Sequence, residues 1–361
     1  MADLSVELCG FPLPNPFVLA SGPLTWNAAA IEAAFAAGAS AAVTKTIRPE
    51  ATVNPVPHIA DAGRGSVLNT EGWSDFSAEE WIERELPALR GRPGGVLIAS
   101  MGHTPEEVAE IAGRVAAAGP DIVELVSYRA EDAAPMVAVA KAKTDLPVLI
   151  KVTANWPNLV DVVDACLAAG ADGVTAIDSI GPTLRIDVET GEPLLGSFAW
   201  LSGRAILPIS LRAVAQICQR HRVPVVGTGG VGQAEDAVEM VMAGATAVGV
   251  HSLPMMQGLG WFGRTLARLD RWLEKRGHGR LADLRGAALP HLQEPMPHTP
   301  LAFAFDQEAC TRCGRCVTVC AYGARVLTDE GDMLLDEEIC RSCGLCVTVC
   351  APGALEVAAG P

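Results

Sequence analysis

A cysteine motif that occurs twice near the C-terminus constrains the fold of this chain more than any other feature. The first copy has the spacing CxxCxxCxxxC, and the second repeats it thirty residues later, within the segments CGRCVTVCA and CGLCVTVCA. Of the eleven cysteines, only Cys9, Cys166 and Cys218 lie outside the two copies. Because the start of the chain has no visible export signal, cysteines this concentrated are more typical of metal ligands than of disulfides.

The spacing within each copy is that of a 4Fe-4S site. Three closely spaced thiolates hold one cluster, and the fourth cysteine ligates the other cluster in two-cluster ferredoxins. We therefore expect a first cluster on Cys310, Cys313, Cys316 and Cys350 and a second on Cys340, Cys343, Cys346 and Cys320. The alternative is a pair of zinc sites, but zinc ribbons pair two CxxC knuckles and have no use for a third cysteine. The segment resembles a bacterial two-cluster ferredoxin, although Ala321 and Ala351 replace the usual proline. The resemblance implies one-electron transport.

Over the rest of the chain, short apolar runs alternate with helical patterns. Half of the 361 residues of the full chain are hydrophobic. The predicted strands are FVLA (17–20), AAVT (41–44), VLIAS (96–100), DIVEL (121–125), PVLIKV (147–152), GVTAI (173–177), VPVVG (223–227) and AVGV (247–250), and helices are predicted at 105–118, 157–169, 208–220 and 233–243. Eight strands that alternate with helices over about 250 residues predict an α/β fold, the (β/α)8 TIM barrel. An open doubly wound sheet would need a glycine-rich turn after the first strand, where ASGPLTW has only Gly22.

The sequence predicts three parts. They are a barrel over 1–276, a proline-rich linker over 277–303, and an α+β ferredoxin-like domain over 304–361. No run of eighteen apolar residues occurs, so we expect no membrane span. The formal charge of −15 argues against a nucleic-acid partner, and without an export signal the expected location is the cytoplasm.

Candidate site residues gather where the predicted strands end, the usual place of the active site in such barrels. Strand seven runs into GTGGV, where Gly229 and Gly230 allow backbone N–H groups to approach an anion at a helix N-terminus. His251 and Ser252 follow strand eight. Lys45 and Lys151 end two other strands, where each needs an anion or a polar ligand. The alternative for each lysine is an ion pair at the barrel rim.

Several segments together resemble the class 1 dihydroorotate dehydrogenase barrel. They are NPFVLASGP (15–23), VTKTI (43–47), IKVT (150–153), ADGVTAID (171–178), SGRAILPISLRAV (202–214) and GTGGV (227–231). With the fused clusters, the chain is most similar to the C-terminal half of dihydropyrimidine dehydrogenase and its bacterial large subunit. The resemblance implies bound FMN and reversible reduction of a C=C bond conjugated to a carbonyl in a pyrimidine ring.

The resemblance also implies roles for single residues. Ala20, Ser21 and Gly22 would line the isoalloxazine ring, with Thr44 and Lys45 beside it and Asn69 in contact with substrate or flavin. Lys151 would bond the N1–O2 edge of the flavin or its ribityl chain, and Gly203, Gly229, Gly230 and Ser252 would hold the phosphate. His251 and Asp178 complete the expected cofactor-binding set.

The substrate side departs from the family pattern. Val126 stands where the family has an asparagine, the loop that carries its catalytic Cys or Ser is missing after the fourth strand, and Asp178 and His58 replace an asparagine and an arginine. We therefore expect FMN to be retained and the substrate to differ from a standard pyrimidine. The candidate catalytic residues are Tyr128, His103, His58 and Asp178 as proton donors and Lys45 as a stabiliser of negative charge. Each of three candidates also has a structural alternative to catalysis. Tyr128 could pack on a helix, His103 could be a loop residue, and Asp178 could form an ion pair with Lys151.

Two functions follow from this pattern. The first is an FMN- and iron–sulfur-dependent oxidoreductase that acts on CH–CH groups of a small cyclic substrate. The second is an electron-transfer subunit that relays electrons between its clusters and a partner enzyme. The missing loop favours the relay, whereas Lys45, Asn69 and Lys151 favour the enzyme. No dinucleotide fingerprint occurs, so the expected redox partner is a ferredoxin or an NAD(P)H-oxidising flavoprotein subunit. By analogy with the family, we expect a homodimer or a hetero-oligomer.

Overall fold

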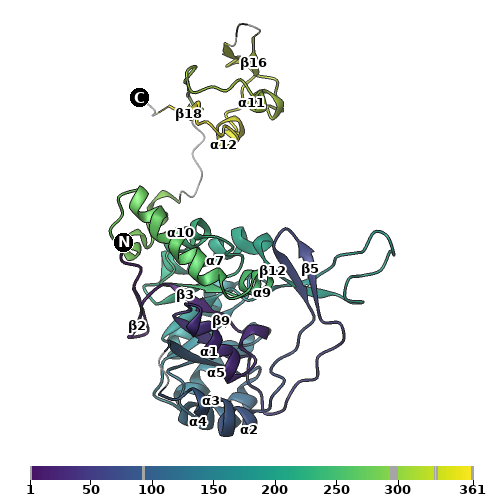
Figure 1. Ribbon diagram of the computed structural model, residues 1–361, viewed down its shortest axis with the longest axis vertical. Coiled ribbons are helices and arrows are strands. Elements are labelled where there is room, and N and C mark those ends of the chain that lie inside the picture. Colours follow the sequence, from purple (N-terminus) through teal and green to yellow (C-terminus); the bar gives the residue numbers. More distant parts are fainter. Residues whose placement is uncertain (1, 92–93, 293–299, 329, 331, 359–361) are drawn as a thin grey trace. The chain divides into compact units, whose positions relative to one another are not determined.

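The chain divides into two units, Met1–Leu292 and Gln293–Pro361 (Figure 1). The computed structural model describes residues 2–91, 94–292, 300–328, 330 and 332–358. Within the predicted linker, residues 293–299 lie outside the described residues. The earlier part of the predicted linker, residues 277–292, belongs to the barrel unit. Leu281 and Leu284 are buried there, and Arg285 Nε donates to the Gly244 carbonyl at 2.9 Å.

Eight parallel strands form a closed barrel in the first unit, which confirms the predicted TIM barrel. They are β3 (Phe17–Leu19), β4 (Ala41–Val43), β7 (Val96–Met101), β8 (Ile122–Val126), β9 (Val148–Val152), β10 (Gly173–Ala176), β13 (Val225–Thr228) and β14 (Ala247–Val250). Every residue of these strands is buried. The strands are rich in Val, Ile, Leu and Ala because helices cover their outer side while side chains fill the interior.

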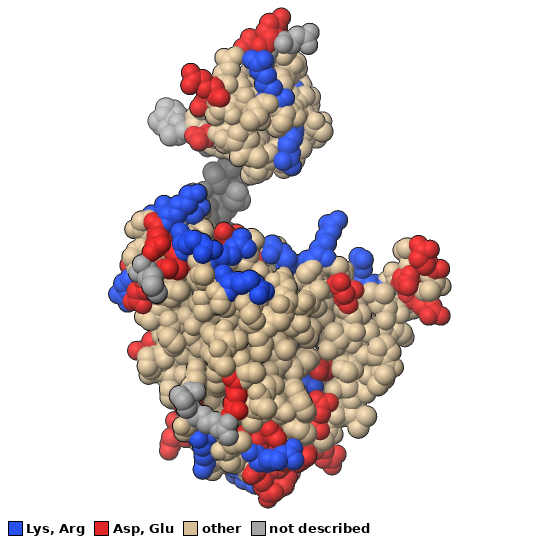
Figure 2. Space-filling model, viewed as in Figure 1, with Lys and Arg blue, Asp and Glu red and all other residues tan. Residues whose placement is uncertain are grey.

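An outer layer of helices surrounds the barrel (Figure 1). The principal ones are α1 (Ala28–Ala36), α4 (Pro105–Ala117), α5 (Ala130–Lys141), α6 (Leu159–Ala168), α7 (Leu207–Arg220), α8 (Ala234–Met242) and α10 (Trp261–Lys275). In α10 the apolar residues Trp261, Leu269 and Leu273 are buried, and Figure 2 shows Lys and Arg side chains gathered over this helix. Such a helix is stabilised mainly by burial of its apolar stripe.

Two antiparallel sheets lie at the two ends of the barrel. At the amino ends of the strands, the hairpin of β1 (Val6–Leu8) and β2 (Phe11–Leu13) packs Leu8 and Leu13 against interior residues such as Val18. A four-stranded sheet, in the order β11-β12-β6-β5, is inserted after β4 and β10, at the carboxyl ends of the strands. Its strands are β5 (Ile59–Gly63), β6 (Ser66–Asn69), β11 (Ile180–Thr183) and β12 (Ala199–Gly203). This sheet brings Asn69 and Gly203 to the mouth of the barrel.

Shorter elements complete the first unit. They are η1 (Pro23–Thr25), α2 (Ala78–Glu80), η2 (Trp81–Glu85), α3 (Leu86–Leu89), η3 (Arg204–Ile206), α9 (Ser252–Gln257), η4 (Leu281–Leu284) and η5 (Leu289–His291). Among the residues described, no helix is long and apolar enough to cross a membrane.

The second unit has the ferredoxin-type arrangement that the duplicated motif predicts. Strand β15 (Phe303–Phe305) pairs with β18 (Leu355–Val357), and β16 (Arg325–Leu327) pairs with β17 (Met333–Leu335). Each motif copy forms one helical turn, α11 (Arg315–Thr318) and α12 (Leu345–Thr348). The glycines before these turns, Gly314 and Gly344, have φ of 70° and 76°, a backbone conformation that favours glycine.

Candidate functional site

A cavity that is open to solvent lies at the carboxyl ends of the barrel strands. All of the predicted cofactor-binding residues except Thr44 line it: Ala20, Ser21, Gly22, Lys45, Asn69, Lys151, Asp178, Gly203, Gly229, Gly230, His251 and Ser252. Thr44 is fully buried, and its Oγ1 accepts a hydrogen bond from the Ser100 N–H at 3.0 Å. Its side chain therefore links β4 to β7 rather than forming part of the cavity wall.

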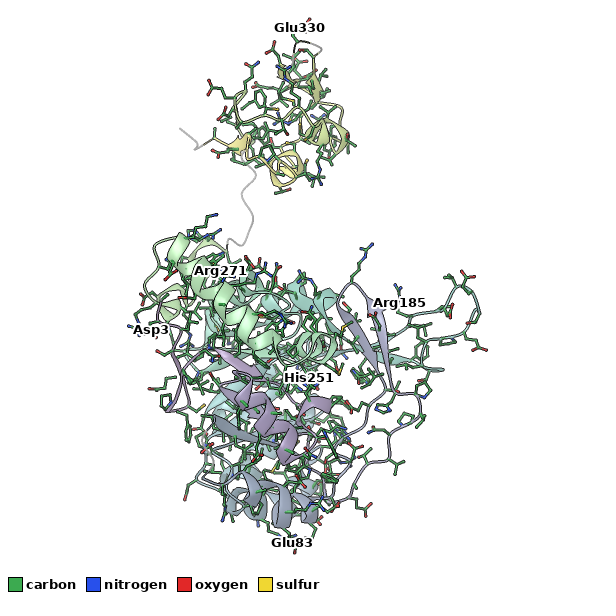
Figure 3. All side chains as sticks on the ribbon, in the orientation of Figure 1. Asp3, Glu83, Arg185, His251, Arg271 and Glu330 are labelled. Carbon is green, nitrogen blue, oxygen red and sulfur yellow. The ribbon has the colours of Figure 1, made fainter. Side chains whose placement is uncertain are left out.

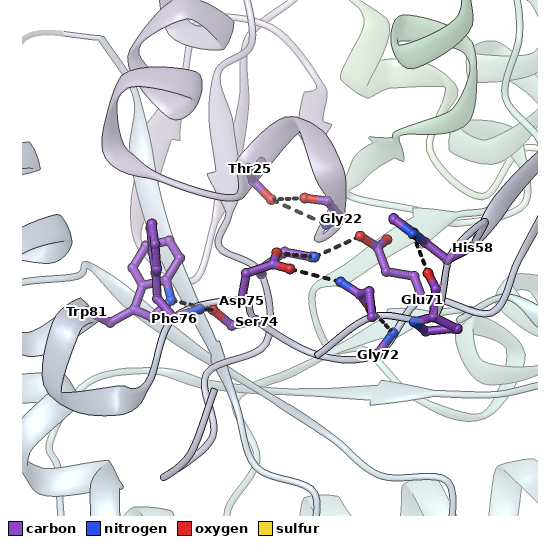
Figure 4. Close-up of polar contacts among 12 residues, drawn as sticks. Gly22, Thr25, His58, Glu71, Gly72, Ser74, Asp75, Phe76 and Trp81 are labelled. Carbon is purple, nitrogen blue, oxygen red and sulfur yellow. Dashed lines mark hydrogen bonds and ion pairs between the residues drawn. The ribbon is translucent and has the colours of Figure 1, made fainter. Parts of the chain in front are cut away.

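Lys45 is held between two carboxylates. Its Nζ lies 2.7 Å from Glu71 Oε1 and 2.7 Å from Asp75 Oδ2 (Figure 4). Asn54 Nδ2 donates to Asp75 Oδ1 at 2.9 Å, and the Gly72 N–H donates to Asn54 Oδ1 at 2.6 Å. Glu71 also lines the cavity and was not predicted from the sequence, although it lies only two residues after Asn69.

Lys151, at the end of β9, pairs with Asp178, which follows β10. Lys151 Nζ lies 3.0 Å from Asp178 Oδ1, and both side chains are largely buried. Burial alone would lower the pKa of the Lys151 ammonium, but the Asp178 carboxylate raises it above its ordinary value. Lys151 therefore remains charged at neutral pH. Both predicted lysines line the cavity and are also in ion pairs, the alternative that the sequence left open.

Glu124 lies inside the barrel, below Lys151. Its Oε2 accepts a hydrogen bond from Thr175 Oγ1 at 2.7 Å, while its Oε1 has no partner among the described residues. Burial raises the pKa of Glu124 above its ordinary value, despite the opposing charge of Lys151. A carboxyl group in these surroundings is favoured in its neutral form.

His251, labelled in Figure 3, lines the cavity, and its buried Nε2 has no hydrogen-bond partner among the described residues. Burial lowers the pKa of His251 to about 4, so the ring is neutral at pH 7. Its Nδ1 lies 2.7 Å from the Ala20 carbonyl, which fixes the proton on Nδ1 and leaves Nε2 as an acceptor. In the part of the chain that the structure describes, no group donates to Nε2. A ligand with an N–H or O–H group would satisfy this nitrogen.

The glycine turn after β13 is tightly packed. Gly229 and Gly230 have φ of +113° and +92°, and a Cβ on Gly230 would lie 2.5 Å from backbone atoms of Leu207. The N–H groups of Gly232 and Gln233, at the start of α8, already donate to Asp236 Oδ2. If a phosphate binds here, the turn itself is thus a better candidate than the first turn of α8.

Two aromatic side chains, those of Tyr128 and Trp73, also line the cavity. The Tyr128 ring stacks on Trp200 at a centroid distance of 4.8 Å and lies 5.0 Å from Trp73 and 5.3 Å from His103. Burial, together with the Asp178 charge, raises the pKa of Tyr128 above its ordinary value, so its hydroxyl keeps its proton. Only three residues separate the end of β8 at Val126 from the start of α5 at Ala130.

The two histidines predicted as proton donors, His103 and His58, are not among the residues that line the cavity. His103 packs behind Tyr128, and burial, with a smaller contribution from the Arg48 charge, lowers its pKa. His58 Nδ1 lies 2.9 Å from the Pro55 carbonyl. Trp73 was not predicted from the sequence, yet it lines the cavity beside Tyr128.

The eight motif cysteines divide between two cavities of the second unit. Cys310, Cys313, Cys316 and Cys350 line one, and Cys320, Cys340, Cys343 and Cys346 line the other, as in the two predicted sets. In the described part of the chain, no three His, Cys, Asp or Glu side chains are close enough to share one metal ion. A quartet around a cavity suits a cluster better than a zinc ion, whose thiolates crowd around one centre.

The donor groups therefore fit both kinds of cofactor. For FMN, the barrel cavity offers two ammonium groups, an unsatisfied ring nitrogen and a glycine turn. For the clusters, all eight thiols are free. Burial raises the pKa of Cys320, but N–H groups of Ala324, Arg325, Tyr322 and Gly323 lower it below its ordinary value, and such donors also stabilise sulfur bound to iron.

Comparisons with known proteins agree with this geometry. The profile of the family described as dihydroorotate dehydrogenase matches residues 3–273, and that of the 4Fe-4S dicluster domain matches residues 309–354. The chain is 32% identical over 309 residues to the protein named dihydroorotate dehydrogenase B (NAD(+)), catalytic subunit, of Geotalea uraniireducens, a match that covers 80% of this chain and 98% of the relative. For the protein of the same name from Methanosarcina mazei, the identity is 33% over 301 residues, covering 79% and 95%. The chain therefore belongs to the dihydroorotate dehydrogenase family of FMN-dependent oxidoreductases that act on CH–CH groups, and it carries a 4Fe-4S dicluster domain.

Proposed function

We propose that this protein reduces or forms a C=C bond conjugated to a carbonyl in a small cyclic substrate, with electrons that pass through the two clusters of the same chain. The observation that carries the proposal is the meeting of two kinds of residue in one cavity. Lys45, Lys151 and the glycine turn, which would hold the flavin, line the same cavity as the aromatic side chains of Tyr128 and Trp73. We propose further that the substrate is not a standard pyrimidine, because only three residues join β8 to α5 in place of a loop with a catalytic Cys or Ser, and Ser127 among them is buried.

The residues of the chain divide the chemical tasks. Bound FMN supplies a group that exchanges two electrons with the substrate and single electrons with iron–sulfur clusters. Lys151 and Lys45 would hold its ring and balance negative charge, and the His251 Nε2 would accept a hydrogen bond from it. Tyr128 would hold the proton that the substrate carbon requires, because its raised pKa keeps the hydroxyl protonated.

The names of the relatives support a partner protein. They are called catalytic subunits and refer to NAD(+). We propose that electrons reach this chain from a ferredoxin or from an NAD(P)H-oxidising flavoprotein subunit, and that the chain works as a homodimer or a hetero-oligomer. About a fifth of this chain lies outside the match to those relatives. The fused clusters underlie the proposed likeness to the C-terminal half of dihydropyrimidine dehydrogenase.

A second function, electron relay without an organic substrate, is favoured by one observation. As candidate proton donors, the turn between β8 and α5 contains only Ser127, Tyr128 and Arg129. The Tyr128 ring stacks on Trp200. Under this alternative the flavin would exchange electrons with the clusters and a partner enzyme only.

Anaerobic purification followed by flavin extraction and iron and sulfide analysis tests the common basis of both functions. We expect FMN and about eight irons per chain. The dithionite-reduced protein is then mixed with a panel of cyclic and acyclic enones. Reoxidation of the flavin by a member of the panel supports the enzyme. Reoxidation by a ferredoxin, with none by the panel, supports the relay, and a colourless protein that contains zinc contradicts both.

A further inference from the structure

Arg325 is a buried cation without a counter-charge. Its exposed fraction is 4%, and its Nη2 has no hydrogen-bond partner in the described residues. The guanidinium carbon lies 4.8 Å from the centroid of the Phe303 ring. No carboxylate of the described residues forms an ion pair with it. Arginine is rarely buried unless it is paired, because an isolated charge loses its hydration.

The cavity beside Arg325 offers the missing counter-charge. Arg325 lines the cavity formed by Cys320, Cys340, Cys343 and Cys346, and it is absent from the wall of the other cysteine cavity. A 4Fe-4S cluster bound by four thiolates is an anion, and reduction adds a further negative charge. A buried cation at its side therefore stabilises the reduced cluster more than the oxidised one.

The internal duplication supplies a built-in comparison. In the second motif copy Leu355 stands at the position of Arg325, and the residues before them, Ala354 and Ala324, are the same. Leu355 is buried and lines the first cavity. The first cavity thus has an uncharged side chain where the second has a guanidinium.

The first cavity has charges of its own, but they face water. Arg312 and Arg315 line it and are exposed, as Arg341 is at the second cavity. An exposed charge acts through solvent and is screened by salt, so its effect is several times weaker than that of a buried one. The Arg325 charge also reaches the Cys316 thiol of the first set. Because Arg325 lines the second cavity and not the first, the expected effect is larger at the second cluster, although it is not confined to it.

We propose that Arg325 raises the reduction potential of the second cluster, on Cys320, Cys340, Cys343 and Cys346, above that of the first. The second cluster is reduced first, and the pair is ordered in potential by a single buried side chain. The inference concerns the clusters alone and stands whether or not the proposed substrate chemistry is correct.

A redox titration of the full-length protein, followed by electron paramagnetic resonance, tests the order. Dithionite supplies one electron to each cluster, and wild type should titrate in two separate steps. Arg325→Leu should lower the higher step by at least tenfold in its equilibrium constant, about 59 mV for one electron, and so bring the steps together. Arg325→Lys, which keeps the charge, should retain most of the separation. Arg315→Leu, the matched exposed arginine, should shift its step by much less.

Leucine occupies the equivalent position of the other copy, so Arg325→Leu is expected to fold, and Arg325→Met gives the same test if the leucine variant loses iron. The proposal is overturned if the neutral variant leaves both steps in place, if the lower step is the one that moves, or if Arg315→Leu has an equal effect.

Discussion

Ion pairs decide what the two lysines of the barrel cavity contribute. The sequence predicted both lysines, since a cation at the end of a buried strand needs a partner. It did not predict Glu71 and Asp75 around Lys45, because their meeting depends on how the segment after β6 turns back toward β4. For the same reason the sequence placed His251 only in the general cofactor-binding set and did not predict that its ring lies against Gly22 and Ala20. Residue type and strand position were predictable, and the pairing of side chains across loops was not.

Asp178→Asn should raise the two-electron midpoint potential of the bound flavin. In the wild type, the Asp178 carboxylate lies 3.0 Å from Lys151 Nζ and offsets the charge available to a reduced flavin. Removal of that charge should favour reduction by roughly tenfold, or about 30 mV for two electrons, in a dye-coupled titration. Asp172→Asn is the matched control, because Asp172 pairs with Lys141 at 3.0 Å just before the start of β10. An unchanged or lower potential in Asp178→Asn would contradict this account.

Tyr128→Phe should slow proton transfer to the substrate and leave flavin binding unchanged. The substitution removes the hydroxyl but keeps the ring on Trp200. A general acid typically contributes about 10²–10⁴ in rate, so reoxidation of the reduced flavin by an active enone should fall by about that factor in stopped-flow measurements. Since the pKa of Tyr128 lies above its ordinary value, the wild-type rate should not decline below about pH 10 through loss of this proton. An equal rate in Tyr128→Phe would remove Tyr128 as the donor.

At the level of elements, the eight barrel strands were predictable and the sheet at the barrel mouth was not. Barrel strands are continuous apolar runs between helices, a pattern that few other structures produce. Strands β5 and β11 are short and half-exposed, and β11 contains Pro182, so neither an apolar run nor a regular alternation marks them. Strand β6 pairs on one side with β5, its neighbour in sequence at residues 59–63. On the other side it pairs with β12, which lies far along the chain at residues 199–203. Pairing of this kind depends on the completed barrel rather than on local pattern.

Gly230→Ala should destabilise the connection between β13 and α8. Alanine is strained at φ +92°, and its Cβ would lie 2.5 Å from the Leu207 backbone. We expect a loss of about 2 kcal/mol or more from the free energy of unfolding, seen as a lower thermal midpoint of the barrel unit in calorimetry. Gly263→Ala, within α10 and with no atom in the way, should instead gain up to about 1 kcal/mol. Equal midpoints for the two variants would show that the turn does not require glycine.

For the whole molecule, we expect the fusion of the two units to determine how electrons reach the flavin. Curated relatives match about four fifths of this chain, and the dicluster profile matches residues 309–354, beyond the barrel match. A tethered electron carrier acts at an effective concentration set by its linker, so it does not have to be encountered by diffusion. The cysteine spacing in the sequence predicts that the second unit carries electrons while the barrel unit binds the flavin. The spacing does not encode which cluster accepts electrons first, because that depends on one buried side chain.

The double variant Cys313→Ser, Cys343→Ser should keep its flavin and lose its route from one-electron donors. Each substitution removes one thiolate from a different quartet, while every cavity residue of the barrel unit is untouched. With reduced ferredoxin as the donor, flavin reduction in this variant should be at least about tenfold slower than in wild type, by stopped-flow absorbance, because the tethered carrier is lost. Direct reduction by dithionite should still reach completion and serves as the control for an intact flavin site. If ferredoxin reduces the flavin equally fast in both proteins, the clusters are not on the route, and the barrel receives its electrons directly.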